Sequence, residues 1–250
     1  MTWLRYVNLS DEYERRARFL PGVLTVIPLF PTLLTAGSGI LDLKTLLLGG
    51  VGIGAVVSVG LSHLASAMGN RIQLILWPQW PHDSPTNRWL HPSENETSGQ
   101  QKRIWYRAIK RLVSIDIQAA IDSGESIETT INDAVVALRH LFNGEEKAER
   151  LRRSNLDYGF ARNLVGLRSV WGSFLVLSTA VTWLAHWTSS KGSLEMAVVS
   201  TVLAIVLLPC AIYVLPSYVR IKAQYYAESF FGTLTAVDEN ASNAYKGGQW

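Results

Sequence analysis

Four long apolar segments, separated by polar sequence, dominate the hydrophobic pattern of this chain. Residues 196–215 contain no charged side chain, and as a helix these 20 residues would cover about 30 Å, the thickness of the hydrocarbon core of a bilayer. Residues 19–41 are also uncharged, while 45–67 and 169–187 contain one histidine each and no Asp, Glu, Lys or Arg. The pattern predicts an all-α membrane protein with four spans.

The polar sequence between the second and third apolar segments predicts how the chain is divided. A mean hydropathy of +0.14 is low for a pure membrane bundle, and the polar stretch has the length of one small soluble domain. We therefore expect two transmembrane helical hairpins that flank an inserted helical domain. The expected boundaries are an N-terminal segment 1–18, a first hairpin 19–67, the inserted domain 68–163, a second hairpin 164–216 and a C-terminal segment and tail 217–250.

The distribution of lysine and arginine predicts the orientation of these spans. The short connections 39–44 and 188–195 hold one lysine each, whereas the N-terminal segment, the inserted domain and the C-terminal segment carry almost all other basic side chains. Because basic residues are retained on the cytoplasmic side, both termini and the inserted domain are expected in the cytoplasm. The net charge of +3 fits a protein that lies against anionic lipid and requires no duplex nucleic acid as a partner.

The first apolar segment is expected to be a retained span with a kinked or broken helix. Pro21, Pro28 and Pro31 each remove a backbone donor, and acidic residues in the preceding segment argue against a cleaved signal peptide. A broken helix is tolerated where protein or water satisfies the freed carbonyl groups, so this span would face other helices or a cavity. In the alternative interpretation, the prolines only reflect their frequency in membrane helices.

Small side chains recur every four residues along the second apolar segment. Gly50, Gly54, Ser58 and Ser62 share one helix face, which allows another helix backbone to approach closely. This seam packs against helices of the same chain in one interpretation, and against a second copy or around a pore in the other.

Three amphipathic helices are expected in the inserted domain. The first covers 101–124, the second begins at Ser126 and stops at 143–144, and the third begins at 145–146 and runs straight into the third span. The stripes expected to face the core are Ile104, Ala108, Leu112, Ile115 and Ala119 in the first helix, and Ile127, Ile131, Ala134, Val135, Leu138 and Phe142 in the second.

Patterns that would indicate catalysis or cofactor binding are missing from the sequence. The five histidines lack the spacing of metal ligands, and no Asp or Glu lies inside an apolar segment. The nucleophile-elbow and phosphate-loop patterns are missing as well. We therefore expect no catalytic residue, no metal and no cofactor, in a protein that is not an enzyme.

A cluster of basic side chains before the third span is the best charged candidate for function. Its members are Lys147, Arg150, Arg152, Arg153 and Arg162. In one interpretation they hold anionic lipid headgroups. In the other they form a cytosolic site for a nucleotide, an oligonucleotide signal or the acidic face of a partner.

Arg168 and several hydroxyl groups are the candidates for lining a pore. Arg168 lies about one turn inside the third apolar segment, where it either snorkels to the headgroups or lines the inner mouth of a pore. The hydroxyls of Thr25 and Thr32 in the first span either face a water-filled lumen or bond to their own helix backbone. The same two alternatives apply to Thr35, Ser173, Thr179 and Thr182.

After the last span, Pro216 is expected to end the helix. Aromatic and basic side chains follow between Tyr218 and Phe231, a composition typical of a segment that lies on the bilayer surface. The polar sequence from Asp238 onward predicts a frayed tail.

Residues 84–90 (SPTNRWL) and 154–167 (SNLDYGFARNLVGL) resemble signatures in a group of small bacterial four-span proteins, similar to the membrane effector of the Hailong anti-phage system. The resemblance implies a homo-oligomeric, channel-forming effector in the bacterial inner membrane that depolarises the cell when phage infection is sensed. It also implies a partner besides the lipid bilayer, namely a nucleotidyltransferase-like enzyme or its oligonucleotide product.

The sequence therefore favours an oligomeric ion channel or membrane-permeabilising effector of anti-phage defence, gated by its cytosolic domain through a nucleotide-type signal or a partner. The alternative is a non-conducting membrane anchor or scaffold, whose cytosolic domain recruits a partner protein. A membrane-embedded enzyme acting on lipids has the least support.

Overall fold

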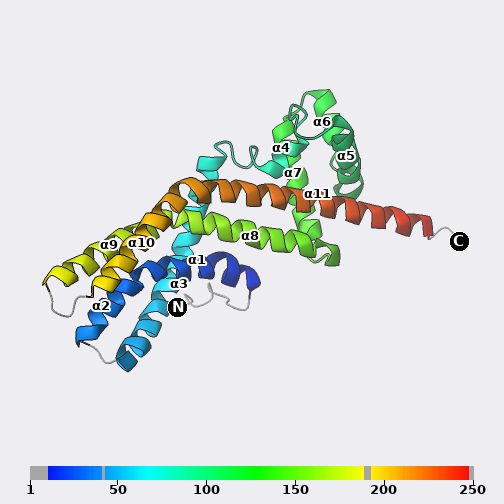
Figure 1. The fold of residues 1–250 in the computed structure, drawn as a ribbon. Helices are drawn as coiled ribbons and strands as arrows, with labels where there is room; N and C mark the ends of the chain where they lie inside the picture. The colour runs from blue at the N-terminus through cyan, green and yellow to red at the C-terminus, as the bar shows by residue number, and fades with distance from the viewer. Residues whose placement is uncertain (1–10, 41–42, 189–192, 248–250) are drawn as a thin grey trace, which may run out of the picture. The chain divides into compact units, whose positions relative to one another are not determined.

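The computed structural model describes residues 11–40, 43–188 and 193–247, and all regular structure in these ranges is helical (Figure 1). Side chains are described in the same ranges except at 36–56, 58 and 242–247. The chain divides into two compact units. Unit 1 comprises Met1–Gln73 and Leu156–Val219, and unit 2 comprises Leu74–Asn155 and Arg220–Trp250. The all-helical prediction is confirmed for the described part.

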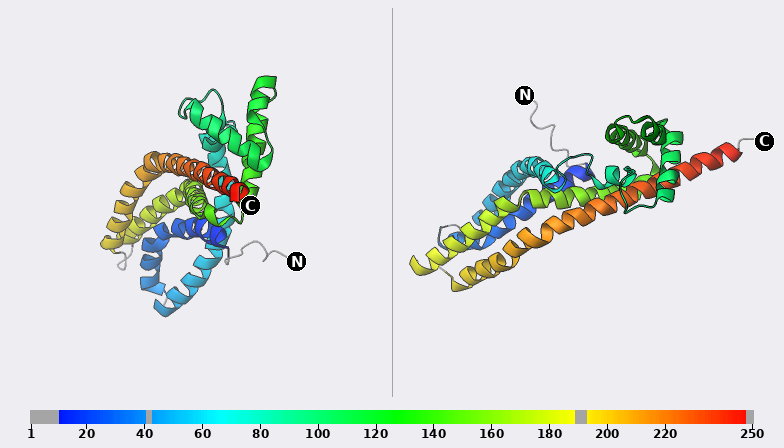
Figure 2. Two further views of the ribbon diagram at one scale, coloured as in Figure 1. Left: turned by 90° about the vertical axis from the view of Figure 1, so that its right-hand side faces the viewer. Right: turned by 90° about the horizontal axis from the view of Figure 1, so that it is seen from above.

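Unit 1 contains the long apolar helices. They are a π-helical turn Glu14–Phe19, α1 (Leu20–Val26), a 3-10 turn Ile27–Leu29, α2 (Phe30–Ile40), α3 (Leu43–Leu76) up to Gln73, α8 (Glu149–Gly166) from Leu156, α9 (Arg168–Thr188), α10 (Leu194–Pro209), a π-helical turn Cys210–Val214 and the start of α11 (Leu215–Gly247). Helices α9 and α10 run side by side (Figure 2). Ala65, Leu167 and Trp171 form a buried cluster with Leu175 and Ala211.

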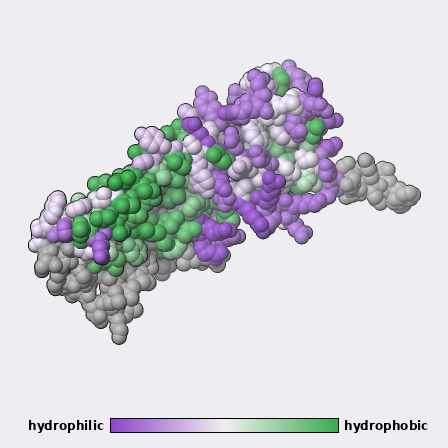
Figure 3. All heavy atoms as spheres, viewed as in Figure 1, coloured by the Kyte–Doolittle hydropathy of each residue, from purple (hydrophilic) through white to green (hydrophobic). Residues whose placement is uncertain are grey.

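Two helices in the described ranges are long and apolar enough to cross a membrane. They are Glu14–Thr35 and Leu194–Ala241, and a third is added if the bent pair Glu146–Gly166 and Arg168–Thr188 counts as one span. Hydrophobic side chains gather over α9 and α10 (Figure 3), and Ile205 and Tyr213 are 67% and 75% exposed. The predicted span 45–67 lies largely outside the residues whose side chains are described, so four spans remain a prediction.

The first apolar segment departs from regular α-helix at Pro28, whereas Pro21 and Pro31 lie within α1 and α2 and the predicted break is absent from Glu14–Thr35. The helix narrows to a 3-10 turn at Ile27–Leu29, around Pro28, before α2 begins. Proline has no N–H to donate and its ring clashes with the carbonyl of the preceding turn, which explains the local change of helix type.

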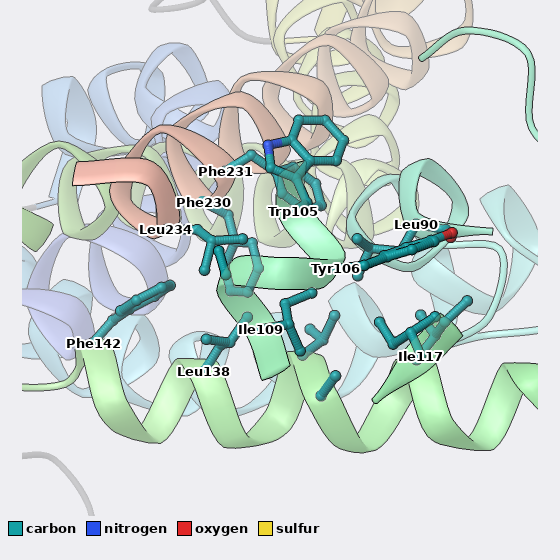
Figure 4. Packing of buried hydrophobic residues seen from close by; sticks show 14 of the residues in the cluster. Leu90, Trp105, Tyr106, Ile109, Ile117, Leu138, Phe142, Phe230, Phe231 and Leu234 are labelled. Carbon is teal, nitrogen blue, oxygen red and sulfur yellow. The ribbon is translucent and has the colours of Figure 1, made fainter. Parts of the chain in front are cut away.

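Unit 2 is a small helical bundle with an aromatic core (Figure 4). It contains α4 (Pro85–Leu90), α5 (Gly99–Val113), α6 (Ile117–Ser123), α7 (Ile127–Phe142), a 3-10 turn Glu146–Ala148 and α11 from Arg220. The rings of Trp105 and Phe231 are nearly parallel with centroids 3.9 Å apart, and Trp89 lies 5.8 Å from Phe231. Stacked aromatic pairs of this kind contribute about 0.5–1.5 kcal/mol beyond the burial of their surface.

Helix α7 matches its prediction in start, end and buried face. Ser126 is its N-cap and Asn143 its C-cap. The buried side chains are Ile131, Ala134, Val135, Leu138 and Phe142, which is the predicted stripe apart from the partly buried Ile127.

The expected single helix 101–124 is wrong, because the chain breaks into α5 and α6. Ser114 has a φ of 60°, in the left-handed region, and Asp116 then caps α6 by accepting from the N–H of Ala119. The buried face of α5 also differs in part from the predicted stripe, although Ala108 is buried as expected. Trp105, Tyr106 and Ile109 are buried, whereas Ile104 is among the exposed hydrophobic residues.

The prediction that the last helix ends at Pro216 is also wrong. The wide π-helical turn Cys210–Val214 precedes the proline and accommodates its missing donor, so α11 continues to Gly247. The expected surface-lying aromatic segment is part of the core, since Phe230 and Leu234 are fully buried. Asp238, expected in a frayed tail, is paired with Arg111, whose Nε donates to the carboxylate at 2.8 Å.

Tyr106 predicts a specific pH dependence of stability. Burial raises the pKa of its phenol to about 12, and the hydroxyl donates to the carbonyl of Leu90. Below about pH 10 the phenol is protonated in folded and unfolded chains, so its contribution is complete; between about 10 and 12 only the unfolded chain ionises, and the contribution is lost. We expect the difference in free energy of unfolding between the native chain and Tyr106→Phe to fall by about 2 kcal/mol over this range.

The measurement is urea unfolding of the detergent-solubilised protein, followed by tryptophan fluorescence from pH 8 to 12. Tyr225→Phe is the control, because Tyr225 is 51% exposed. Parallel pH curves for the native chain and Tyr106→Phe would contradict the assignment.

Candidate functional site

The break between α8 and α9 is the most distinctive feature of unit 1. Helix α8 ends at Gly166 and α9 begins at Arg168, with an angle of 50° between them. Leu167 at the break is fully buried, and its N–H still donates to the carbonyl of Asn163 at 3.1 Å. The expectation of a helix running straight into the third span is therefore wrong.

At this bend the backbones of α3 and α8 touch. A Cβ atom on Gly166 would lie 2.6 Å from the backbone N of Gly69 and 2.8 Å from the carbonyl carbon of Met68. A Cβ atom on Gly69 would in turn collide with Oδ1 of Asn163. One turn earlier, a Cβ atom on Gly159 would lie 3.0 Å from Cβ of Ala17. Only glycine permits these approaches without moving the neighbouring helix.

A buried polar network surrounds the contact. Nδ2 of Asn163 donates to the carbonyl of Ala17 at 2.7 Å, and Nε2 of Gln73 donates to the hydroxyl of Tyr158 at 2.8 Å. Nη1 of Arg162 donates to Oε1 of Gln73 at 3.0 Å. We call this set the polar junction; its members are Ala17, Gly69, Gln73, Tyr158, Gly159, Arg162, Asn163 and Gly166.

The polar junction holds three parts of the chain in one arrangement. Asn163 is fully buried and Gln73 is 7% exposed, so an alternative packing would leave polar groups without partners. An unsatisfied buried polar group costs about 1–3 kcal/mol, which makes such a network specific for one geometry. The helix around Ala17, α3 and α8 are therefore coupled at this place.

The structure separates the predicted basic cluster into different environments. Arg162 belongs to the polar junction, where it also lies over the ring of Tyr158. Arg152 and Arg153 both bind Glu149, and their hydrogen bonds hold the pKa of that carboxyl below its usual value. Lys147 and Arg150 are exposed and form no ion pair within the described ranges.

The small-residue seam on α3 is described only at its last member. The side chains at positions 50, 54 and 58, which are Gly50, Gly54 and Ser58, lie outside the described residues. Ser62 is 5% exposed and its hydroxyl donates to the carbonyl of Val59 at 2.7 Å. This end of the seam is therefore packed inside the chain.

The candidate pore-lining hydroxyl groups of the apolar helices donate hydrogen bonds to protein atoms. Thr25 is fully buried and donates to the carbonyl of Pro21 at 2.8 Å. Thr32 donates to Oγ of Ser178 at 2.9 Å, and thereby links α2 to α9. Thr35, Ser173, Thr179 and Thr182 each donate to a carbonyl one turn earlier in their own helix. Arg168 is half-buried at the first position of α9.

In unit 2 the segment 84–90 is the start of a small buried network. Ser84 caps α4 and is hydrogen-bonded to Thr86 at 3.2 Å, while Nδ2 of Asn87 donates to Asn132 at 3.4 Å. The sequence did not single out Lys102, which is 5% exposed and donates to the carbonyl of His91 at 2.7 Å and to that of Glu94. Its desolvation by burial lowers the pKa of the amine.

Comparison with known proteins finds no matching family model, no matching curated protein and no matching solved structure. Across residues 11–40, 43–188 and 193–247, no group of three His, Cys, Asp or Glu side chains is arranged to hold a metal ion.

Gly166→Ala is predicted to destabilise the polar junction. Its added methyl group meets backbone atoms at 2.6–2.8 Å, and overpacking of this kind costs about 1–3 kcal/mol. Gly172→Ala is the matched control on α9, since its Cβ would lie 3.6 Å from a methyl of Leu208, an ordinary contact. Thermal unfolding in detergent should show a lower midpoint for the first variant only. Equal midpoints for Gly166→Ala and the native chain would refute the backbone contact.

Proposed function

We propose that this protein is a four-span, homo-oligomeric ion channel or membrane-permeabilising effector, with two transmembrane hairpins around an inserted cytosolic helical domain. Support comes from the two or three helices long and apolar enough to cross a membrane and from the exposed apolar surface of α9 and α10. The distribution of basic side chains favours an orientation with both termini in the cytoplasm, and the resemblance of residues 84–90 and 154–167 implies the bacterial inner membrane.

The polar junction is the observation that carries the proposal. A buried polar network at a 50° bend has two properties that a gate requires: it specifies one arrangement, and its disruption releases several hydrogen bonds together. Along the chain, the polar sequence 74–155 is connected to α9 through α8 and this bend. A signal received by the cytosolic domain would thus act on the closed state by loosening the junction.

The conducting path is proposed to lie between copies of the chain. Hydroxyls of α1, α2, α9 and α10 are hydrogen-bonded within unit 1; Thr182, for example, is 2.7 Å from Oγ of Ser200. Side chains used in this way stabilise helix packing and are not available to line a lumen. Arg168 at the start of α9 would then favour anions at the inner mouth.

The resemblance of residues 84–90 and 154–167 supplies the biological setting. It supports an effector of anti-phage defence that depolarises an infected cell, together with a nucleotidyltransferase-like partner or its oligonucleotide product. Within the effector, Lys147 and Arg150 are the residues we propose for contact with that anionic signal, because they are exposed and lack ion pairs in the described ranges.

Ion leak from proteoliposomes tests the channel against a non-conducting anchor. We expect little leak from the native full-length chain and a severalfold faster leak from Asn163→Ala, because this change removes the 2.7 Å hydrogen bond to the carbonyl of Ala17. Asn155→Ala is the control, since Asn155 is half-buried and forms no hydrogen bond in the described ranges. If vesicles that contain Asn163→Ala leak no faster than protein-free vesicles, the result contradicts a channel and supports a non-conducting membrane anchor.

Charge reversal at Lys147 and Arg150 is predicted to weaken binding of an oligonucleotide. The probe is fluorescent tetra-adenylate, and its anisotropy with the detergent-solubilised chain is measured at several salt concentrations. Lys147→Glu/Arg150→Glu should raise Kd by about tenfold or more at low salt, since two phosphate contacts are replaced by repulsion. Arg103→Glu/Arg107→Glu, the same charge change on the exposed face of α5, should leave Kd unchanged. An equal loss in both variants would indicate unspecific attraction and contradict the site.

A further inference from the structure

Unit 2 contains a cavity of about 400 Å³. Its walls come from the end of α3, the segment that follows α3, α4 and the first turns of α11 within unit 2. The lining residues with charged, polar or aromatic side chains are Trp77, Asp83, Arg88, Trp89, Glu96, Arg220 and Gln224. The cavity thus combines two indole rings with two cations and two carboxylates.

Pairing inside the cavity leaves one charge of each sign without a partner. Arg88 is bound by Glu94 at 2.5 Å and by Glu96, so these charges satisfy each other. Asp83 accepts a hydrogen bond from the N–H of Gln79 at 3.1 Å but forms no ion pair among the described residues. Arg220 is exposed and likewise has no ion pair there. A ligand that carries both a negative and a positive group would satisfy both.

The position of the walls in the sequence indicates the source of that ligand. Arg220 is the first charged residue after the uncharged stretch 196–219, and Leu76 ends the apolar helix α3. In a chain that crosses the membrane, both residues stand at the level of the headgroups, where tryptophan and arginine are typical. Phospholipid headgroups are the most concentrated phosphate compounds at that depth.

We propose that this cavity binds the headgroup of a phospholipid that carries a phosphate and a primary ammonium. Arg220 binds the phosphate and Asp83 accepts hydrogen bonds from the ammonium, which also faces the indole of Trp77. Gln224, one turn after Arg220, donates to the phosphate or the ester oxygens. The inference rests on the proposed insertion into a membrane.

This chemistry discriminates among headgroups. A choline headgroup carries three methyl groups on nitrogen and has no N–H to donate to Asp83. A glycerol headgroup has no positive charge and leaves the carboxylate of Asp83 unpaired, because Arg88 is already bound by Glu94 and Glu96. The site should therefore prefer ethanolamine over choline and glycerol headgroups with the same acyl chains.

Native mass spectrometry of the full-length chain in detergent tests the preference. Phosphatidylethanolamine, phosphatidylcholine and phosphatidylglycerol with identical acyl chains are titrated separately, and the fraction with one lipid bound gives the affinity. We expect the ethanolamine lipid to bind at least about fivefold more tightly than the other two, a difference within the range of one charge-assisted hydrogen bond. Equal affinities would overturn the proposal.

Two variants assign the roles of the free charges. Asp83→Asn should remove the preference for ethanolamine while retaining the affinity for phosphatidylcholine, and Arg220→Gln should weaken all three lipids. Asp133→Asn and Arg103→Gln are exposed controls outside the cavity that should change neither quantity. Unchanged binding by Asp83→Asn and Arg220→Gln would place the bound lipid elsewhere.

Soluble competitors distinguish the lipid from other phosphate compounds. Free phosphoethanolamine and adenosine monophosphate are added at the concentration of the lipid. If neither compound displaces much of the bound lipid, the result supports a headgroup site. If either compound displaces the bound lipid as strongly as added lipid does, the occupant is a soluble ligand and the proposal is overturned. A chain that purifies as a soluble monomer without detergent would refute membrane insertion, while a detergent-dependent chain with no headgroup preference would refute only this inference.

Discussion

The direct contact between the backbones of α3 and α8 is the constraint on which the structure of unit 1 depends. At Gly69 and Gly166 no side chain separates the two helices, so the polar groups of Asn163 and Gln73 are brought to within hydrogen-bond distance of Ala17 and Tyr158. In an apolar environment helices gain little from burying hydrophobic surface against each other, because lipid solvates that surface equally well. Close packing of small residues and buried hydrogen bonds must then supply the specificity, and both occur at this one place.

The same reasoning explains why the hydroxyls of unit 1 are turned inward. Thr182 and Ser200 join α9 to α10 at 2.7 Å, and at the next residue of each helix Nε1 of Trp183 donates to Thr201 at 2.9 Å. Each bond is modest, about 1 kcal/mol in membrane helices, but it fixes which face of α10 meets α9. The opposite face, with Ile205 and Val202, is left apolar and exposed.

The sequence patterns predicted a helix well where all of its apolar side chains lie on one face and enter one core. Helix α7 follows its stripe from Ile131 to Phe142 because all of these side chains enter one core. The pattern failed where the backbone interrupts the helical period. Ser114 adopts a left-handed conformation that splits the expected helix, and this conformation is uncommon for a residue other than glycine, so the sequence gives little sign of it. The bend at Leu167 was not predicted, because it depends on a contact between residues far apart in the sequence, the close approach of Gly166 to Gly69. Spacing alone did offer one signal, the small or polar series Gly159, Asn163 and Gly166 on one face of α8.

Helix α11 shows how one continuous helix serves two environments. Its buried positions Val219, Ala223, Ala227, Phe230 and Leu234 follow the helical repeat as a single stripe, and Asp238 extends it to the ion pair with Arg111. Alanine near the start lets the helix backbone lie close to its neighbours, whereas phenylalanine further along fills the core around Trp105. An aromatic and basic composition therefore did not mean a segment lying on a bilayer, because Phe230 and Phe231 are buried in the core of unit 2, while Tyr225 stays exposed with Lys222 over its ring. Because Arg220 and Gln224 lie off the buried stripe, they remain free to line the cavity of unit 2, and the burial of the aromatic face is what orients them.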